Sequence, residues 1–277
     1  MDHSSAKYLL AGSPSEFERL RLQARVWEPE AEAMLDQIGI QAGWSCIDLG
    51  CGAMGILDPL SRRVGTSGRV IGVDNDHRQL AAARAYAQEL GRNNIELVEQ
   101  DAYQTDFPRG AFDFVHVRFV FAPVGRDEEL LREMIALTRP GGIVAIQEPD
   151  ATCWNCFPQH QAWDRLKQAI LAAFEQGGGD FNAGQRTYGM LREAGLEDVH
   201  IRAAVIALQN QHPYMRLPIQ FATSLRQRIL GAALLTEEEL DASLAACEQL
   251  ASHPETSALT FIVTQVWGRK SLSVSHQ

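Results

Sequence analysis

The stretch Ile47-Asp48-Leu49-Gly50-Cys51-Gly52 decides how this chain folds. Residues 44–48 form a short apolar run bounded by glycine, which predicts a buried parallel strand. The glycines that follow predict a sharp turn whose backbone a ligand can approach closely. A helix that starts after such a turn offers free N–H groups, which favour a bound carboxylate. Taken alone, the stretch fits a nucleotide site or an ordinary tight turn.

Strands and helices alternate along the rest of the chain. Short segments typical of strands recur at 69–74, 95–99, 112–117, 143–147, 199–207 and 259–267. Segments typical of helices lie between them, at 77–90, 127–138, 158–175 and 184–194. This order indicates helices on both faces of a sheet. The fold class that we expect is α/β, a doubly wound, seven-stranded, mostly parallel sheet with its final strand reversed.

Acidic residues follow two of the predicted strands. Asp74 ends Ile71-Gly-Val-Asp74, where a carboxylate can accept hydrogen bonds from two ribose hydroxyls. Asp101 follows the next strand, where it can receive an adenine amino group. The carboxyl ends of parallel strands meet at one crevice, so these groups are expected to form one nucleotide site. A dehydrogenase stays open as an alternative, because Gly50, Gly52 and Gly55 also satisfy the dinucleotide fingerprint.

The order of these motifs resembles the class I S-adenosylmethionine-dependent methyltransferases, of the ubiquinone/menaquinone-biosynthesis type. The resemblance spans residues 40–150 and rests on Asp48-Leu-Gly-Cys-Gly52, Val73-Asp74, Gln100-Asp101-Ala102, Phe112-Asp113 and Arg139-Pro-Gly-Gly142. It implies a Rossmann-like methyltransferase fold with S-adenosyl-L-methionine as cofactor. One departure is Met54, which stands where the family often has a third glycine and has Gly55 beside it.

The resemblance also implies which residues bind the cofactor. The glycine turn would hold the methionine part, Asp74 the ribose and Asp101 the adenine. Tyr8 and Gln23 lie in a segment that closes over the cofactor in some of these enzymes, although the segment also fits an ordinary packing helix. The predicted cofactor-binding residues are Tyr8, Gln23, Asp48, Gly50, Cys51, Gly52, Asp74, Asn75, Gln79, Asp101, Ala102, Tyr103, Arg118 and Phe119.

Catalytic residues leave a weaker signal. Methyl transfer is an in-line displacement that is promoted largely by holding the reactants close and aligned. A general base is needed only for a weakly nucleophilic acceptor. Glu148 ends the fifth predicted strand and His160 begins a helix, so we predict these two as catalytic residues. His116 lies within a strand and is interpreted as a packed core histidine.

Aromatic residues interleaved with glycines follow the fifth predicted strand. They suit an apolar acceptor and can steady a cationic methyl group, although ordinary helix packing would use the same residues. The predicted substrate-binding residues are Trp154, Phe157, Phe181 and Tyr188.

The organisation that we expect has four parts. A helical lid at 1–40 precedes a methyltransferase core at 41–207 and 258–269. A helical cap at 208–257 shapes the acceptor pocket or forms a dimer surface, and a disordered tail follows at 270–277. Pro29 is expected to divide the lid helix in two.

Composition and charge disfavour several kinds of partner. The net charge of -10 disfavours nucleic acid, and no apolar run is long enough for a membrane span. The N-terminus lacks a signal-peptide pattern, and the five cysteines are an odd count. We therefore expect a cytoplasmic protein, either a homodimer or a higher homo-oligomer if it assembles. Cys153 and Cys156 have zinc-like spacing, but no second pair matches them, so no metal is predicted.

The function predicted from the sequence is methyl transfer from S-adenosylmethionine to O, N or C of a small apolar or aromatic metabolite, in secondary metabolism by resemblance. One alternative is a methyltransferase-fold cyclase or a non-methylating cofactor binder, because a fold does not fix its chemistry. The other alternative is a nucleic-acid or protein methyltransferase.

Overall fold

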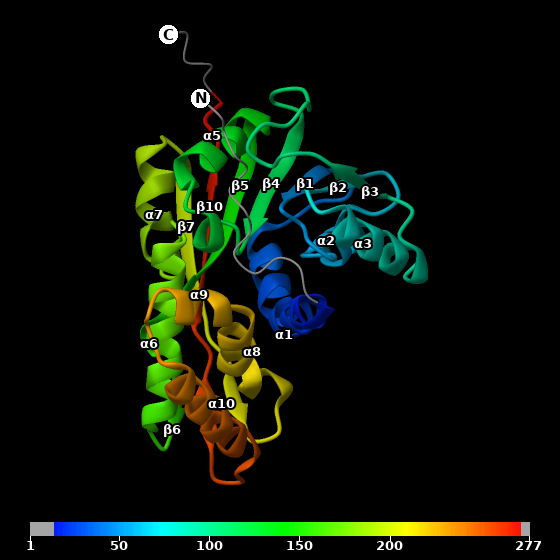
Figure 1. Cartoon of the computed structure of the whole chain (residues 1–277). Helices are drawn as coiled ribbons and strands as arrows, with labels where there is room; N and C mark the ends of the chain where they lie inside the picture. Colours follow the sequence, from blue (N-terminus) through cyan, green and yellow to red (C-terminus); the bar gives the residue numbers. More distant parts are fainter. Residues whose placement is uncertain (1–13, 273–277) are drawn as a thin grey trace.

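A seven-stranded sheet forms the centre of the structure, a computed structural model that describes residues 14–272 (Figure 1). The strands follow the order β3-β2-β1-β4-β5-β10-β7, and only β10 runs antiparallel to its neighbours. Their bounds are β1 Ser45–Leu49, β2 Arg69–Asp74, β3 Ile95–Glu99, β4 Phe112–Arg118, β5 Thr138–Asp150, β7 Glu197–Ala204 and β10 Ile262–Arg269. The predicted fold class and the reversed final strand are therefore confirmed.

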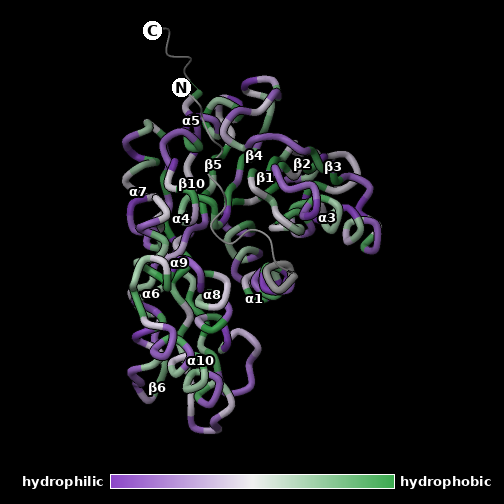
Figure 2. Tube along the Cα trace, viewed as in Figure 1, coloured by the Kyte–Doolittle hydropathy of each residue, from purple (hydrophilic) through white to green (hydrophobic). Residues whose placement is uncertain are grey.

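Helices cover both faces of this sheet because alternate strand residues are apolar in each direction. On one face, side chains such as Cys46 and Phe114 pack against α2 (Leu57–Val64) and α3 (His77–Glu89). On the other face, side chains such as Ile47 and Val115 pack against α5 (Asp127–Leu137) and α7 (Gly184–Glu193). The short helix α4 (Phe121–Val124) follows β4. Figure 2 shows the hydrophobic colour along the central strands β4 and β5.

The lid helix α1 (Pro14–Ile38) is one continuous helix, so the expectation that Pro29 divides it is wrong. The buried side chains of Trp27, Ala31 and Met34 lie on both sides of Pro29 in the sequence and on one face of the helix. Their burial outweighs the loss of one backbone hydrogen bond at proline.

The cap is larger than predicted and draws on two separate segments of the chain. Its helices are α6 (Gln161–Gln176), α8 (Leu217–Ser224), α9 (Arg226–Gly231) and α10 (Glu237–Ser252), with short 3-10 turns η1 (Ala151–Cys153) and η2 (Pro213–Arg216). A three-stranded sheet joins them, formed by β6 (Asn155–Phe157), β9 (Ser257–Leu259) and β8 (Ala207–Gln209). The predicted core boundary was therefore wrong for 151–176, because the apolar face of α6 packs against α8, α9 and α10.

The end of the chain is partly fixed. The backbone of Lys270 pairs with Gly141 and Gly142, and its Nζ donates to the carbonyl oxygens of Ile135 and Thr138 at 2.7 Å. The predicted disordered tail is thus wrong for Lys270, and residues 273–277 lie outside the described residues. Within 14–272, no helix is both long enough and apolar enough to cross a membrane.

Candidate active site

The glycine turn after β1 is built from backbone conformations that few residues adopt. Gly50 and Gly52 have φ values of +71° and +54°. The N–H groups of Gly50 and Cys51 both donate to Val73 O, at 2.7 and 2.9 Å, which fastens the turn to β2. A Cβ at Gly50 would lie 2.6 Å from Val120 Cγ2, whereas a Cβ at Gly52 would meet nothing within 4 Å. The turn is therefore closed on its Gly50 side and open over Gly52.

Asp48 supports this turn from beneath. Its carboxylate is buried and lies 3.5 Å from the N–H of Ile56 and 2.7 Å from His116 Nδ1. A Cβ at Gly55 would overlap Asp48 Oδ2, so position 55, next to Met54, requires glycine. Met54, at the family's usual glycine position, has its own unusual φ of +137°. The buried side chain of Asp48 thus shapes the turn, and its contact with the cofactor stays a prediction.

Cys51 is likewise turned inward. Its thiol is buried against β2, and burial raises its pKa well above the usual range. Because the thiol is buried, any contact of Cys51 with the cofactor is predicted to use its backbone atoms.

Asp74 stands at the carboxyl end of β2, beside the turn. Its Oδ2 accepts from the N–H of Gly52 and its Oδ1 from the N–H of Asp76, both at 2.9 Å. Burial raises the pKa of Asp74, against the opposing effect of these amides. The side chain is partly exposed, and Asn75 beside it is exposed, so both are accessible to a ligand.

The predicted adenine end lies beyond β3. Asp101 is exposed, and its Oδ1 accepts from the N–H of Tyr103 at 2.9 Å. Ala102 packs on the sheet, and the guanidinium of Arg126 lies 4.2 Å over the Tyr103 ring. Two buried polar atoms here, Gln79 Oε1 and Tyr103 OH, have no hydrogen-bond partner among the described residues.

Arg118 and Phe119 lie at the carboxyl end of β4. Arg118 Nη2 donates to Gly55 O at 3.1 Å, while its buried Nη1 has no hydrogen-bond partner among residues 14–272. Burial lowers the pKa of Arg118, against the attraction of Asp48. Phe119 has a φ of +58°. From the lid, the buried Gln23 accepts a hydrogen bond from Arg19 at 2.7 Å. Tyr8 lies outside the described residues.

The space and the polar atoms around the turn fit S-adenosylmethionine. The open backbone over Gly52 leaves room for a ligand, and Asp74 offers carboxylate oxygens to a ribose. The unpartnered Gln79 Oε1 and Arg118 Nη1 are buried atoms that a bound polar molecule can satisfy. When bound, the cofactor supplies an electrophilic methyl group, and the protein's task is to align it with an acceptor.

Glu148 was predicted as a catalytic residue, and its geometry gives it another task. It is fully buried, and its carboxylate accepts hydrogen bonds from the N–H groups of Val120, Phe121 and Ala122 at 2.8, 2.9 and 3.1 Å. Burial raises its pKa to about 8, while the amides oppose that shift. The side chain therefore fixes the start of α4 and is closed to a substrate.

His160 and Phe157 lie too far from the turn for the roles predicted for them. The glycines after α6 meet the core, since the N–H of Asp180 donates to Ala122 O at 2.8 Å. Helix α6 has 16 residues, so its first residue lies about 22 Å from its last. His160 caps that far end through a bond from the N–H of Ala162, and Phe157 is exposed on β6.

Of the residues predicted to bind substrate, Trp154 and Phe181 are buried side by side, whereas Tyr188 is exposed on α7. Their rings stack with centroids 5.4 Å apart. Sequence reasoning missed the two rings that complete this group, Phe221 on α8 and Phe261 before β10. We call Trp154, Phe181, Phe221 and Phe261 the aromatic cluster. No local pattern identifies the last two, because their positions depend on how the cap folds back.

The aromatic cluster reaches both the lid and the end of β4. Phe261 stacks on Trp27 of α1 at 5.5 Å and meets Phe119 edge-on at 6.0 Å. Trp27 Nε1 donates to Tyr214 OH at 3.0 Å. Burial raises the pKa of Tyr214 to about 12, so it stays a neutral phenol. Lid, cap and core therefore meet around one group of rings.

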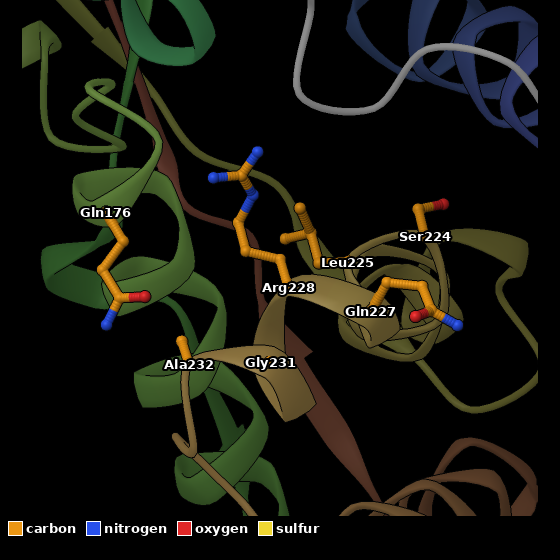
Figure 3. Close-up of a pocket in the computed structure, with 7 residues that line it drawn as sticks. All are labelled: Gln176, Ser224, Leu225, Gln227, Arg228, Gly231 and Ala232. Carbon is orange, nitrogen blue, oxygen red and sulfur yellow. The ribbon is translucent and has the colours of Figure 1, made fainter.

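A groove of about 590 Å³ lies between the end of α6 and helices α8 and α9. Figure 3 shows its lining, with Gln176 on one side and Arg228 and Gln227 on the other. Its polar lining differs from the aromatic cluster, although Leu225, which lines it, belongs to the same apolar core as Phe221.

The fold, the glycine turn and the carboxylate after β2 together define a class I S-adenosylmethionine-dependent methyltransferase. A family model described as "Methyltransferase domain" matches residues 40–195, more than half of the chain. The chain belongs to this family.

Two demethylmenaquinone methyltransferases are among the similar proteins. The one from Oceanobacillus iheyensis is 32% identical over 119 residues, which cover 43% of this chain and 50% of that protein. The one from Shouchella clausii is 26% identical over 201 residues, 65% of this chain and 81% of that protein. Among solved structures, the YcgJ protein of Bacillus subtilis has a TM-score of 0.58 at 17% identity, covering 86% of this chain and 97% of that one. That likeness shows the fold.

Proposed function

We propose that this chain transfers a methyl group from S-adenosylmethionine to a small acceptor that carries an aromatic or quinol-type ring. The observation that supports the proposal is the aromatic cluster, which packs against Phe119 at the end of β4. The four rings are buried against one another, whereas Phe119 is partly exposed. We therefore propose that the acceptor ring adds to the cluster from the Phe119 side, because planar rings favour stacked or edge-on partners.

The similar proteins support the same kind of acceptor. Two of them are named for demethylmenaquinone, a quinone. We therefore propose a quinol-type ring in place of the secondary metabolite that the resemblance alone favoured. Neither of the two predicted bases is free beside the cluster, because Glu148 is bound by three amides and His160 lies at the far end of α6. Catalysis is then proposed to rest on alignment of acceptor and methyl group.

The cofactor half of the proposal is tested by calorimetry with S-adenosylmethionine. Asp74→Asn is expected to weaken binding at least about tenfold, because an amide beside the Gly52 N–H cannot replace both carboxylate oxygens. Asp76→Asn is the matched control, since it removes the same charge two residues away and keeps a cap for α3. Equal effects of the two variants would contradict the assignment of Asp74.

The acceptor half is tested by release of S-adenosylhomocysteine from panels of quinols, naphthols, aliphatic acids and amines. Turnover is expected with the ring compounds, and Phe221→Leu is expected to raise the acceptor KM about tenfold through loss of ring contacts. Phe157→Leu is the control, because Phe157 is exposed at the far end of the cap. Turnover with aliphatic acceptors alone would overturn the proposal.

A further inference from the structure

A row of polar side chains crosses the face of the sheet that α1 covers. Asp48, His116, Gln147 and Gln265 stand on β1, β4, β5 and β10, and none is more than 1% exposed. Arg202 on β7 continues the row. The strand register places Asp48 opposite His116, and Gln265 opposite both Gln147 and Arg202. The step from His116 to Gln147 is diagonal, because His116 lies opposite Ala145, two residues earlier on β5.

Hydrogen bonds join every neighbour in this row. Arg202 Nη1 donates to Gln265 Oε1 at 2.5 Å, and Gln265 Nε2 donates to Gln147 Oε1 at 2.7 Å. Gln147 Nε2 lies 2.9 Å from His116 Nε2, and His116 Nδ1 lies 2.7 Å from Asp48 Oδ1. A guanidinium can only donate and a carboxylate can only accept, so both glutamine amides and the histidine tautomer have one consistent orientation.

Apolar side chains could occupy the positions of this row with a smaller desolvation penalty. One layer away from the carboxyl edge, the same face carries Cys46, Phe114, Ala145 and Trp267, which are buried apolar side chains. Burying polar groups disfavours folding unless all are paired, and a fully paired row adds little stability over apolar packing. The polar row therefore points to orientation of its neighbours rather than to stability.

The two ends of the row reach the lid helix and the glycine turn, the two elements that we predict to flank the cofactor. At one end, Gln265 Nε2 donates to Glu30 O of α1 at 3.1 Å, and Arg202 forms an ion pair with the Glu30 carboxylate. Trp27 and Gln23 lie one and two turns before Glu30 on the same helix, so the anchor at Glu30 sets their positions. At the other end, Asp48 carries the turn that contains Gly55.

We propose that this row positions the lid helix and the glycine turn relative to each other, and so prepares both sides of the cofactor site as one unit. Its middle members, Gln147 and Gln265, are positioning residues that touch neither cofactor nor acceptor. The proposal depends on the cofactor of the class and not on the ring acceptor proposed above.

The test is a double-mutant cycle on the Kd for S-adenosylhomocysteine, measured by calorimetry. Gln147→Leu breaks the row near the turn, and Arg202→Met breaks it at the lid. Each is expected to weaken binding about tenfold, within the usual range for coupled sites. If the row acts as a unit, the double variant is also about tenfold weaker, since the second break removes nothing further. A product of the two effects, near a hundredfold, would overturn the proposal, as would single effects below about twofold.

Two further measurements keep the test independent of cofactor binding and of folding. Thr264→Val is the matched control, because Thr264 is the buried neighbour of Gln265 that faces Gly184 on the opposite side of β10. It is expected to leave the Kd unchanged. Hydrogen exchange without ligand is expected to be faster in α1 of Arg202→Met and unchanged in α3. Arg202 is partly exposed at the sheet edge, so Arg202→Met is expected to fold. The exchange measurement therefore tests the proposal even if Gln147→Leu does not fold. Unchanged exchange in α1 would overturn the proposal even if the protein bound no cofactor.

Discussion

The cofactor half and the cap meet where Phe119 contacts Phe261, but the two regions are held together differently. Around β1 and β2 the structure depends on backbone geometry, with left-handed glycines at 50, 52 and 55 and amides fastened to Val73 and Asp74. The cap depends on side-chain volume, with the rings of Trp154, Phe181 and Phe221 packed together. Backbone geometry admits few substitutions, whereas apolar cores accept many of similar volume. The cofactor half is therefore the constrained one, and the cap is the region that tolerates more substitutions.

The largest effect is expected from a cavity in the cap. Trp163 is buried in the cap core at 1% exposure, on α6. Trp163→Ala is expected to lower the free energy of unfolding by about 3–5 kcal/mol in urea titrations. The Kd for S-adenosylhomocysteine of the folded variant should change less than about twofold, because distant sites act independently. Tyr188→Ala is the control, exposed on α7 and expected to cost no more than about 0.5 kcal/mol. A large loss of cofactor affinity in Trp163→Ala would show that the two regions are not separable.

Next is a backbone substitution in the cofactor half. Gly55→Ala puts a methyl group against Asp48 Oδ2 and 3.0 Å from Cys51 O at a φ of +46°. It is expected to lower the free energy of unfolding by about 3 kcal/mol and to weaken cofactor binding. Gly91→Ala has a similar φ of +66° with nothing within 4 Å, and is expected to cost about 1 kcal/mol. If the two variants lose equal stability, the loss comes from backbone strain alone and the contact with Asp48 does not contribute.

A smaller, pH-dependent effect is expected at Glu148, where the two regions join. Its pKa is about 8 in the folded protein, above the usual 4.5, so the folded state holds this proton more tightly. The stability that it contributes is present below pH 4.5 and is lost as the pH rises toward 8. Between pH 5.5 and 7.5, wild type should lose about 1 kcal/mol per pH unit relative to Glu148→Gln in urea titrations. A stability difference that does not vary with pH would show that the carboxylate is ionised throughout.

The smallest effect is expected at His212, the N-terminal capping residue of η2. His212 Nδ1 accepts from the N–H of Tyr214 at 3.1 Å, and burial lowers its pKa from 6.5. Its contribution is therefore present above pH 6.5 and is lost as the pH falls below that value. His212→Asn keeps an acceptor that does not titrate, so it should lose about 0.5–1 kcal/mol less than wild type between pH 7.5 and 5.5. Thermal unfolding at the two pH values measures this difference. Identical losses in wild type and His212→Asn would show that protonation of His212 does not affect stability.

The lid and the cap show where sequence patterns stop being sufficient. Pro29 was expected to end a helix because its local effect is unfavourable, yet packing of Trp27 and Ala31 across it keeps α1 whole. The helical pattern of α6 was recognised, but periodicity does not say which apolar core a helix joins. For the same reason His160 was expected near the site, when it lies at the far end of α6.

The parts of this protein that depend on local chemistry can be predicted from its amino-acid sequence. The turn at Gly50 and Gly52, the carboxylate of Asp74 and the order of the strands follow from backbone freedom, short-range spacing and periodicity. The binding of Glu148 to three amides, and the contact between Gln147 and Gln265, arise from the folding of the whole chain. These contacts join residues far apart in the chain, and their partners are fixed by strand register and chain folding, which no local pattern encodes.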